Sequence, residues 1–269
     1  MILPALLGLV FSVFQMYGFN FDKAVFCGLQ NYINIFTLPD VSIAIKNSFL
    51  FAAITTLGKV FGGLLLAVLL NNRFRSANVL RTIFFSPAVV STVAVGLIFR
   101  SLMHPSKGLI NTLLGAAHLE SLTQNWLTDR ALVMYSLSAI EIWKWTGFTM
   151  VIFLAGLQAI PAEYYEAARV DGASRLAVFR KITFPLLMPS FNNALIINLV
   201  GGLKIFDLIQ ATTNGGPGTA SEVFSTVMYK SFGNGRLGEG CAISFVLVIV
   251  VAVFALPLYL FIAKKEVDL

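Results

Sequence analysis

Long apolar runs, separated by short polar connections, make up most of the chain. A helix that crosses the hydrocarbon core of a bilayer needs about 20 mostly apolar residues. Six runs approach or exceed that length: 2–17, 48–70, 83–103, 131–157, 190–209 and 241–263. The first begins at Met1 without the basic flank of a signal peptide, so we expect a transmembrane helix whose cytoplasmic lead-in is missing or very short. The pattern predicts an all-α integral membrane protein with six transmembrane helices.

Composition agrees with this pattern. Hydrophobic residues make up 57% of the chain and charged residues only 12%, whereas roughly 25% of the residues in soluble domains are charged. A water-soluble protein is therefore excluded. The net charge of +6 is spread among apolar runs and forms no basic stripe of the kind that a duplex requires, so we expect no nucleic-acid partner.

Lys and Arg are about twice as dense in the connections 71–82 and 158–189 and in the tail as in the opposite connections. The residues concerned are Arg73, Arg75, Arg81, Arg169, Arg175, Arg180, Lys181, Lys264 and Lys265. Because cytoplasmic loops are enriched in Lys and Arg, these connections and both termini are predicted to be cytoplasmic. With only Cys27 and Cys241, and two histidines in a polar stretch, we expect no metal site and no disulfide scaffold.

The connection 160–189 has strong local signals for short helices. Pro161 suits the first helical turn, Glu163 complements the positive end of the helix dipole, and Gly172 suits the end of a helix. A second helix is expected from Ser174 to just before Pro185. A helix of about ten residues is marginal alone in water, so it must dock on a partner or pack on its own helix bundle.

Part of this connection reads EAARVDGASRLAVFRKITFPLLMP. It resembles the EAA loop of ABC-importer permeases, with Phe184 where leucine is usual. The segments FLAGLQAIP and FDLIQATTNGGPGTAS resemble the sugar-importer branch of that family, the maltose and glycerol-phosphate type. The resemblance implies a single transmembrane domain, 1–269, with its EAA loop at 158–189.

The resemblance also implies partners. A coupling helix between spans four and five would insert into a cytoplasmic ATPase dimer. Because this sequence lacks a phosphate-binding P-loop, ATP and Mg would be bound by that dimer. The other expected partners are a second, usually distinct permease chain, membrane lipid, and an extracellular or periplasmic sugar-binding protein. The location would be a bacterial-type plasma membrane. The candidate coupling residues are Glu163, Glu166, Ala167, Ala168, Arg169, Asp171 and Gly172.

With Arg100 counted in the connection 100–130, five ionisable side chains fall inside the predicted spans, where each needs a partner or a wet cavity. In span four, Glu141 and Lys144 share a face with two aromatic rings; in span five a similar polar face forms. The candidate pathway residues are Glu141, Lys144, Trp145, Phe148, Asn193, Lys204, Asp207 and Lys59. Polar groups beside aromatic rings suit a sugar, but the charges could equally form ion pairs inside the bundle.

Lys59 has no acid within four residues, so it must pair with another helix, for example at Glu141, or line a wet cavity. An unpaired Lys59 would favour an acidic sugar. Gly201 and Gly202 in span five are compatible with close helix packing or with a local break.

The outer connection 212–221 is rich in glycine and predicts a turn with unusual backbone angles. Asn214, Gly215, Gly216 and Pro217 are candidates for contact with the binding protein, although a simple tight turn explains them as well. The sequence thus predicts a non-enzymatic permease subunit of an ATP-driven sugar importer. The alternative is an ion-coupled secondary transporter that uses Glu141 or Asp207.

Overall fold

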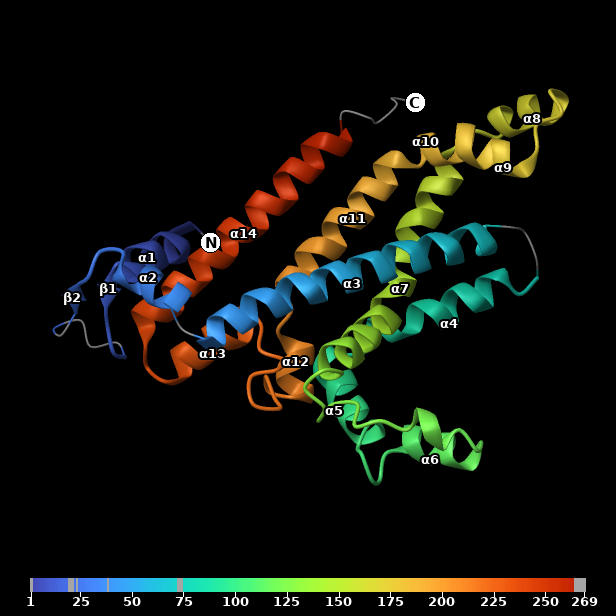
Figure 1. Cartoon of the computed structure of the whole chain (residues 1–269). Coiled ribbons are helices and arrows are strands. Elements are labelled where there is room, and N and C mark those ends of the chain that lie inside the picture. The colour runs from blue at the N-terminus through green and yellow to red at the C-terminus, as the bar shows by residue number, and fades with distance from the viewer. Residues whose placement is uncertain (1, 19–21, 23, 38, 72–74, 264–269) are drawn as a thin grey trace. The chain divides into compact units, whose positions relative to one another are not determined.

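The computed structural model describes residues 2–18, 22, 24–37, 39–71 and 75–263, and it consists mostly of helices (Figure 1). One small antiparallel sheet pairs β1 (Phe14–Gln15) with β2 (Val25–Phe26), with Phe14 opposite Phe26. Arg73, Lys264, Lys265 and both chain ends lie outside the described residues. The predicted orientation in the membrane therefore stays a prediction.

Three helices in the described part of the chain are long and apolar enough to cross a membrane: α3 (Pro39–Leu70), α7 (Val133–Ala159) and α14 (Leu237–Ala263). The number rises to five if each of two bent helix pairs is one span. The architecture is that of a helical membrane protein, but the six-span prediction is not confirmed.

The first predicted span is shorter than expected, because α1 (Ile2–Ser12) ends before β1. The Ser12 hydroxyl donates to the Leu9 carbonyl at 2.6 Å, and the Asn31 amide donates to the carbonyls of Ser12 and Phe14 at 2.8 and 2.9 Å. These side chains satisfy backbone groups at the end of the helix. The prediction of a helix that continues to Tyr17 is wrong.

The third predicted span is interrupted. Helix α4 (Ala77–Val89) ends in an extended residue, Val90, with φ −70° and ψ 140°, and α5 (Thr92–Leu102) begins two residues later. Pro87 lies within the last turn of α4 and has no N–H to donate. The prediction of one continuous helix over 83–103 is wrong, because hydropathy does not register a local loss of backbone hydrogen bonds.

The fifth predicted span is also interrupted. Helix α11 (Met188–Leu203) ends one residue after Gly202, and α12 (Asp207–Thr212) follows after a short gap. A side chain at Gly201 would meet nothing within 4 Å among the described residues, so this glycine does not serve close packing within that part of the chain. The local break is the alternative that the structure shows, and the continuous helix predicted over 190–209 is wrong.

The connection between α7 and α11 contains α8 (Ala162–Val170), α9 (Arg175–Val178), a π-helical turn (Phe179–Thr183) and α10 (Phe184–Leu186). The first helix agrees with the prediction. The second does not end before Pro185, because the wide turn bonds the Phe184 N–H to the Phe179 carbonyl and accommodates the proline.

The chain divides into two compact units, each assembled from three stretches. Unit one contains Met1–Ala52, Ser91–Ile140 and Gly201–Val253. It includes α2 (Gln30–Thr37), α6 (Leu109–Ala116), a 3-10 turn (Glu120–Leu122) and α13 (Phe224–Gly233), and α5 packs against α12. Its two apolar cores centre on Phe51 with Leu137 and on Ile35 with Phe224.

Unit two contains Ala53–Val90, Glu141–Val200 and Phe254–Leu269, and its core includes Val60, Met150 and Phe153. Glycines let α3 approach α7 closely: a Cβ on Gly62 would lie 3.1 Å from Thr146, and one on Gly63 would lie 3.0 Å from the Met150 backbone nitrogen. Small residues at such spacing are typical of helix contacts in membranes. The α3 and α7 segments of this unit therefore form a close-packed pair.

Candidate functional site

Helix α8 follows α7 after two residues and projects, with α9, beyond the end of α7 (Figure 1). Pro161 is its N-cap, Glu163 lies in its first turn and Arg169 in its last turn. Both charges complement the helix dipole. Short connections on either side join α8 to α7 and, through α9, to α11, so a displacement of α8 would act directly on two long helices.

The C-terminal end of α8 is fixed by backbone hydrogen bonds. Gly172 has φ +69°, its N–H donates to the Arg169 carbonyl at 3.1 Å, and the Ala173 N–H donates to the Ala168 carbonyl at 2.9 Å. This is a Schellman motif, which favours glycine at the left-handed position. The role expected for Gly172 as a helix stop is therefore confirmed.

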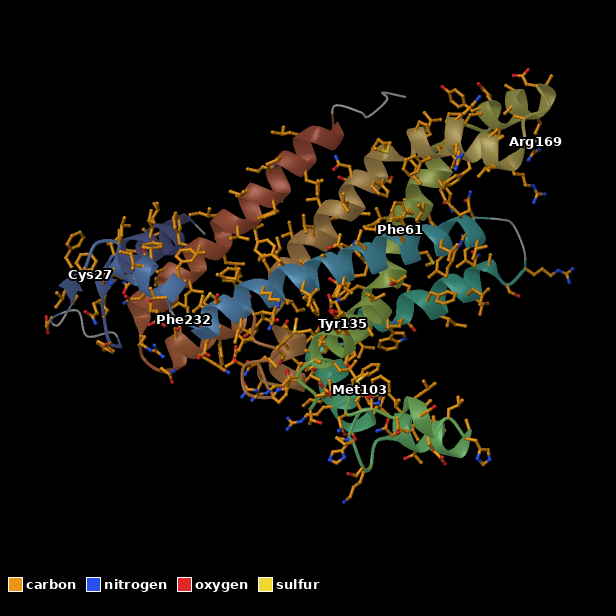
Figure 2. The ribbon with its side chains drawn as sticks, in the orientation of Figure 1. Cys27, Phe61, Met103, Tyr135, Arg169 and Phe232 are labelled. Carbon is orange, nitrogen blue, oxygen red and sulfur yellow. The ribbon has the colours of Figure 1, made fainter. Side chains whose placement is uncertain are left out.

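Most candidate coupling residues are accessible. Ala168 is buried, and the exposed ones are Glu163, Glu166, Ala167, Arg169, Asp171 and Gly172. Arg169 extends from α8 in Figure 2, and Val170 is 88% exposed. A groove of about 350 Å³ lies beside the helix, lined by Tyr164, Ala167, Ala168, Asp171, Ala173, Ala177, Val178, Lys181 and Ile182. The helix thus presents a charged and apolar surface suited to a protein partner.

A buried ion pair joins α3 to α7 within unit two. The Lys59 ammonium donates to Glu141 Oε1 at 3.5 Å, and the two residues are 2% and 4% exposed. Glu141 Oε2 has no hydrogen-bond partner in the described structure. Of the arrangements that the sequence left open for Lys59, pairing with Glu141 is the one observed.

Lys144 is bound differently from the arrangement that its spacing suggested. Its ammonium donates to the carbonyls of Pro87, Ala88 and Val90 at 3.2, 3.3 and 2.6 Å. It also lies 4.7 Å from the centre of the Trp145 ring. Glu141 therefore pairs with Lys59, and Lys144 is held at the break between α4 and α5.

The other candidate pathway residues are more accessible. Trp145 and Phe148 are half-buried and their rings meet edge to face, 5.8 Å apart. Asn193, Lys204 and Asp207 are exposed. Lys204 and Asp207 do not share a helical face, because the chain leaves the helix at Lys204.

One face of α11 is exposed within unit two. Asn193 and Ile197 are both exposed, and because they are four residues apart they lie on the same face of the helix. We call these two residues the α11 stripe. Gly201 and Lys204 are also exposed and belong to unit one.

The predicted outer turn has the unusual backbone angles expected of it. Asn214, Gly215 and Gly218 have φ values of 52°, 84° and 62°. Asn214 is exposed and Gly215 is buried, whereas Gly216 and Pro217 are half-buried. The turn is therefore a specific structure with one accessible corner.

Sequence reasoning missed the side chains that hold this turn. The Asn47 amide donates to the carbonyls of Ala220 and Glu222, each at 2.9 Å, and the buried Glu222 carboxylate accepts from Lys230 and Thr226. Glu222 lies in a connection rather than in a span, so the rule that flags charges within spans did not select it.

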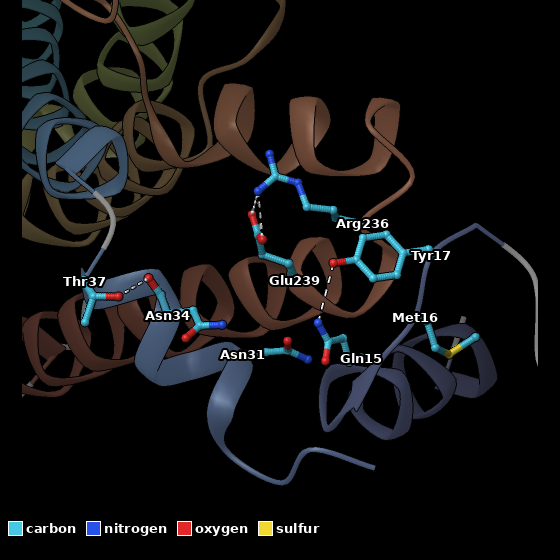
Figure 3. A pocket seen from close by; sticks show the side chains of 8 residues that line it. All are labelled: Gln15, Met16, Tyr17, Asn31, Asn34, Thr37, Arg236 and Glu239. Atoms are coloured by element: carbon cyan, nitrogen blue, oxygen red, sulfur yellow. Dashed lines mark hydrogen bonds and ion pairs between the residues drawn. The ribbon is translucent and has the colours of Figure 1, made fainter. Parts of the chain in front are cut away.

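A polar pocket of about 290 Å³, which the sequence did not indicate, lies in unit one where β1 and α2 meet the start of α14 (Figure 3). Arg236 and Glu239, 3.1 Å apart, form one side of it. The lining residues are Gln15, Met16, Tyr17, Asn31, Asn34, Thr37, Arg236 and Glu239. The paired charges leave the pocket close to neutral.

Known proteins resemble this chain over most of its length. The family described as binding-protein-dependent transport system inner membrane component matches residues 59–264. A probable ABC transporter permease of Bacillus subtilis, YurN, is 36% identical over 268 residues, covering 98% of this chain and 91% of its own. The trehalose/maltose transport permease MalF of Thermococcus litoralis is 34% identical over 233 residues, covering 86% of this chain and 78% of its own.

Solved structures show the same fold. A chain of a bacterial ABC transporter involved in alginate import has a TM-score of 0.86 at 24% identity, covering 98% of this chain and 90% of its own. A chain of a bacterial alginate ABC transporter in complex with an alginate pentasaccharide-bound periplasmic protein has a TM-score of 0.76 at 27% identity, covering 87% of this chain and 81% of its own. With the family match over residues 59–264, these similarities show that the chain is a membrane-embedded permease of the binding-protein-dependent ABC transporter family.

Proposed function

We propose that this permease imports a sugar or oligosaccharide and forms half of the translocation pathway as one transmembrane domain, 1–269, with six spans. The observation that supports a sugar as the substrate is the similarity of this chain to permeases named for sugars: trehalose/maltose in Thermococcus litoralis and multiple sugars in Streptococcus mutans. The structural similarity to an alginate transporter bound to a loaded periplasmic protein supports the same class.

Helix α8 is the coupling helix in this proposal. It carries an accessible Glu166, Ala167 and Arg169 on a helix whose C-terminal end is fixed by a Schellman motif. Because this sequence has no P-loop, a partner ATPase dimer would bind ATP and Mg. Helix α8 would dock in a cleft of that dimer. The EAA loop and both termini then face the cytoplasm, and movement of α8 is transmitted to α7 and α11.

The proposed pathway residues are the α11 stripe, Trp145 and Phe148 in unit two, and Lys204 and Asp207 in unit one. The accessible amide of Asn193 and the ammonium of Lys204 can each donate to sugar hydroxyls, and the half-buried rings suit the apolar faces of sugars. Lys59, Glu141 and Lys144 are buried and already bound to protein groups. We therefore assign these three a supporting role.

The outer turn is the proposed contact for a substrate-binding protein, through Asn214 and the neighbouring Gly215, Gly216 and Pro217. Its fixed conformation supports this assignment, because a preformed surface loses less entropy on binding. A second permease chain, usually a distinct homologue, would complete the pathway.

The ion-coupled alternative receives no support from the structure. Glu141, one of its two candidate ion-binding groups, is buried against Lys59. The family to which the chain belongs depends on a binding protein, whereas an ion-coupled carrier would not need one.

The substrate class can be tested on the purified transporter in lipid nanodiscs. We expect its ATP hydrolysis to rise severalfold when the cognate binding protein is loaded with a saccharide, using maltose, trehalose and an alginate oligosaccharide as probes. The empty binding protein and a binding protein offered amino acids are the controls. Stimulation by amino acids with none by any saccharide would refute the proposed substrate class.

A further inference from the structure

The break between α4 and α5 leaves backbone carbonyls without helical partners. In an α-helix, the carbonyls of Pro87, Ala88 and Val90 would accept from N–H groups four residues later. The extended residue Val90 diverts the chain before those bonds can form, and the Pro87 carbonyl accepts instead from the Val90 N–H at 3.3 Å. Unsatisfied backbone groups at membrane depth cost several kcal/mol each, so this break needs a donor from elsewhere.

Lys144 meets this need. A lysine ammonium has three N–H donors and no acceptor, and three carbonyls lie 2.6 to 3.3 Å from this one. The side chain is only 1% exposed. Every donor has a partner, so Lys144 would have to leave these carbonyls to bind a substrate.

The approach of α7 to α4 is built for this contact. Gly147, three residues after Lys144, lies against α4, and a Cβ at that position would overlap the Phe84 carbonyl and lie 2.9 Å from the Phe85 Cα. The absence of a side chain lets the two backbones come close. The lysine and the glycine therefore act together on the last turns of α4.

The buried charges in unit two also fit this arrangement. Two ammonium groups, of Lys59 and Lys144, accompany one carboxylate, that of Glu141, which pairs with Lys59. The remaining positive charge is stabilised by three carbonyl dipoles and by the Trp145 ring. No acidic substrate is required to neutralise it.

We propose that Lys144 is a positioning residue: its ammonium binds three backbone carbonyls and fixes the C-terminal end of α4. Lysine suits these carbonyls because its charge is compact, whereas the planar fork of arginine suits carboxylates and phosphates. The proposal concerns the architecture of the permease and does not depend on the identity of the substrate.

Chemical rescue of the permease complex in detergent tests the proposal. Lys144→Ala is expected to lower the midpoint of thermal unfolding by about 5–10 °C, because it removes the ammonium from which three partly buried carbonyls accept. Adding n-propylammonium, which restores the missing methylenes and the three donors, is expected to recover at least half of that loss. Tetramethylammonium has no N–H and should recover nothing.

Two variants make the result specific. Lys144→Met fills the same space without a charge, so we expect it to be destabilised and not rescued by propylammonium. Lys46→Ala removes an exposed lysine of α3 and should unfold like the unaltered protein with or without amine. An unchanged midpoint in Lys144→Ala, or equal rescue by both ammonium ions, would contradict the proposal. If Lys144→Ala yields no folded complex, propylammonium in the growth medium and during extraction should restore it, and failure to do so would also count against the proposal.

Discussion

Reversing the charge of Glu166 is expected to abolish substrate uptake while the permease still inserts into the membrane. Glu166 is exposed on α8, so the change removes no contact from the folded interior. At the proposed interface, leaving a charge without its partner costs about 2–5 kcal/mol, which is roughly thirtyfold or more in affinity for the ATPase. Pull-down of the ATPase by the tagged permease, together with uptake in membrane vesicles, measures both effects.

Glu120→Lys is the matched control for Glu166→Lys. Glu120 is also an exposed glutamate in a short helical turn, but that turn belongs to a connection predicted to lie on the outer side. We expect its charge reversal to leave the ATPase bound and uptake unchanged. If Glu166→Lys retains the ATPase and full uptake, α8 is not the coupling helix.

Replacing Lys59 by methionine is expected to prevent stable assembly of the permease. The substitution leaves the Glu141 carboxylate buried without its ion-pair partner, and one of its oxygens already lacks a hydrogen-bond partner in the described structure. Breaking a buried pair on one side typically costs about 3–5 kcal/mol. The amount of folded permease in the membrane and the midpoint of its thermal unfolding report this loss.

The double variant Lys59→Met with Glu141→Gln separates this explanation from a role in substrate binding. It removes both charges, so most of the lost stability should return. Uptake of maltose and of an alginate oligosaccharide should then recover in parallel. A double variant no more stable than the single one would exclude the ion pair as the cause, and selective loss of the acidic oligosaccharide would place Lys59 in the pathway.

Local signals in the sequence were sufficient to predict α8. Pro161, Glu163 and Gly172 act within their own helix, so their positions were enough to predict where the helix begins and ends. The structure confirms both ends of α8. Hydropathy likewise located α3, α7 and α14, because span length depends on composition along one segment.

The interruptions of spans three and five could not be predicted in the same way. The break after α4 is stabilised by Lys144, more than 50 residues away in the sequence, and an average over a window of residues does not detect it. At Gly201 and Gly202 the sequence allowed a break without requiring one. The anchoring of the outer turn by Asn47 joins segments 175 residues apart, and only the folded chain brings them together.

The central claim is that ATP hydrolysis by a partner drives uptake through this permease with the help of a binding protein. The most direct measurement is uptake of a radiolabelled saccharide into proteoliposomes that contain the complete transporter, with ATP and Mg enclosed and the loaded binding protein outside. We predict uptake that requires both ATP and the binding protein and persists when an ionophore collapses the proton gradient. Uptake that follows an imposed proton gradient without ATP would contradict the claim.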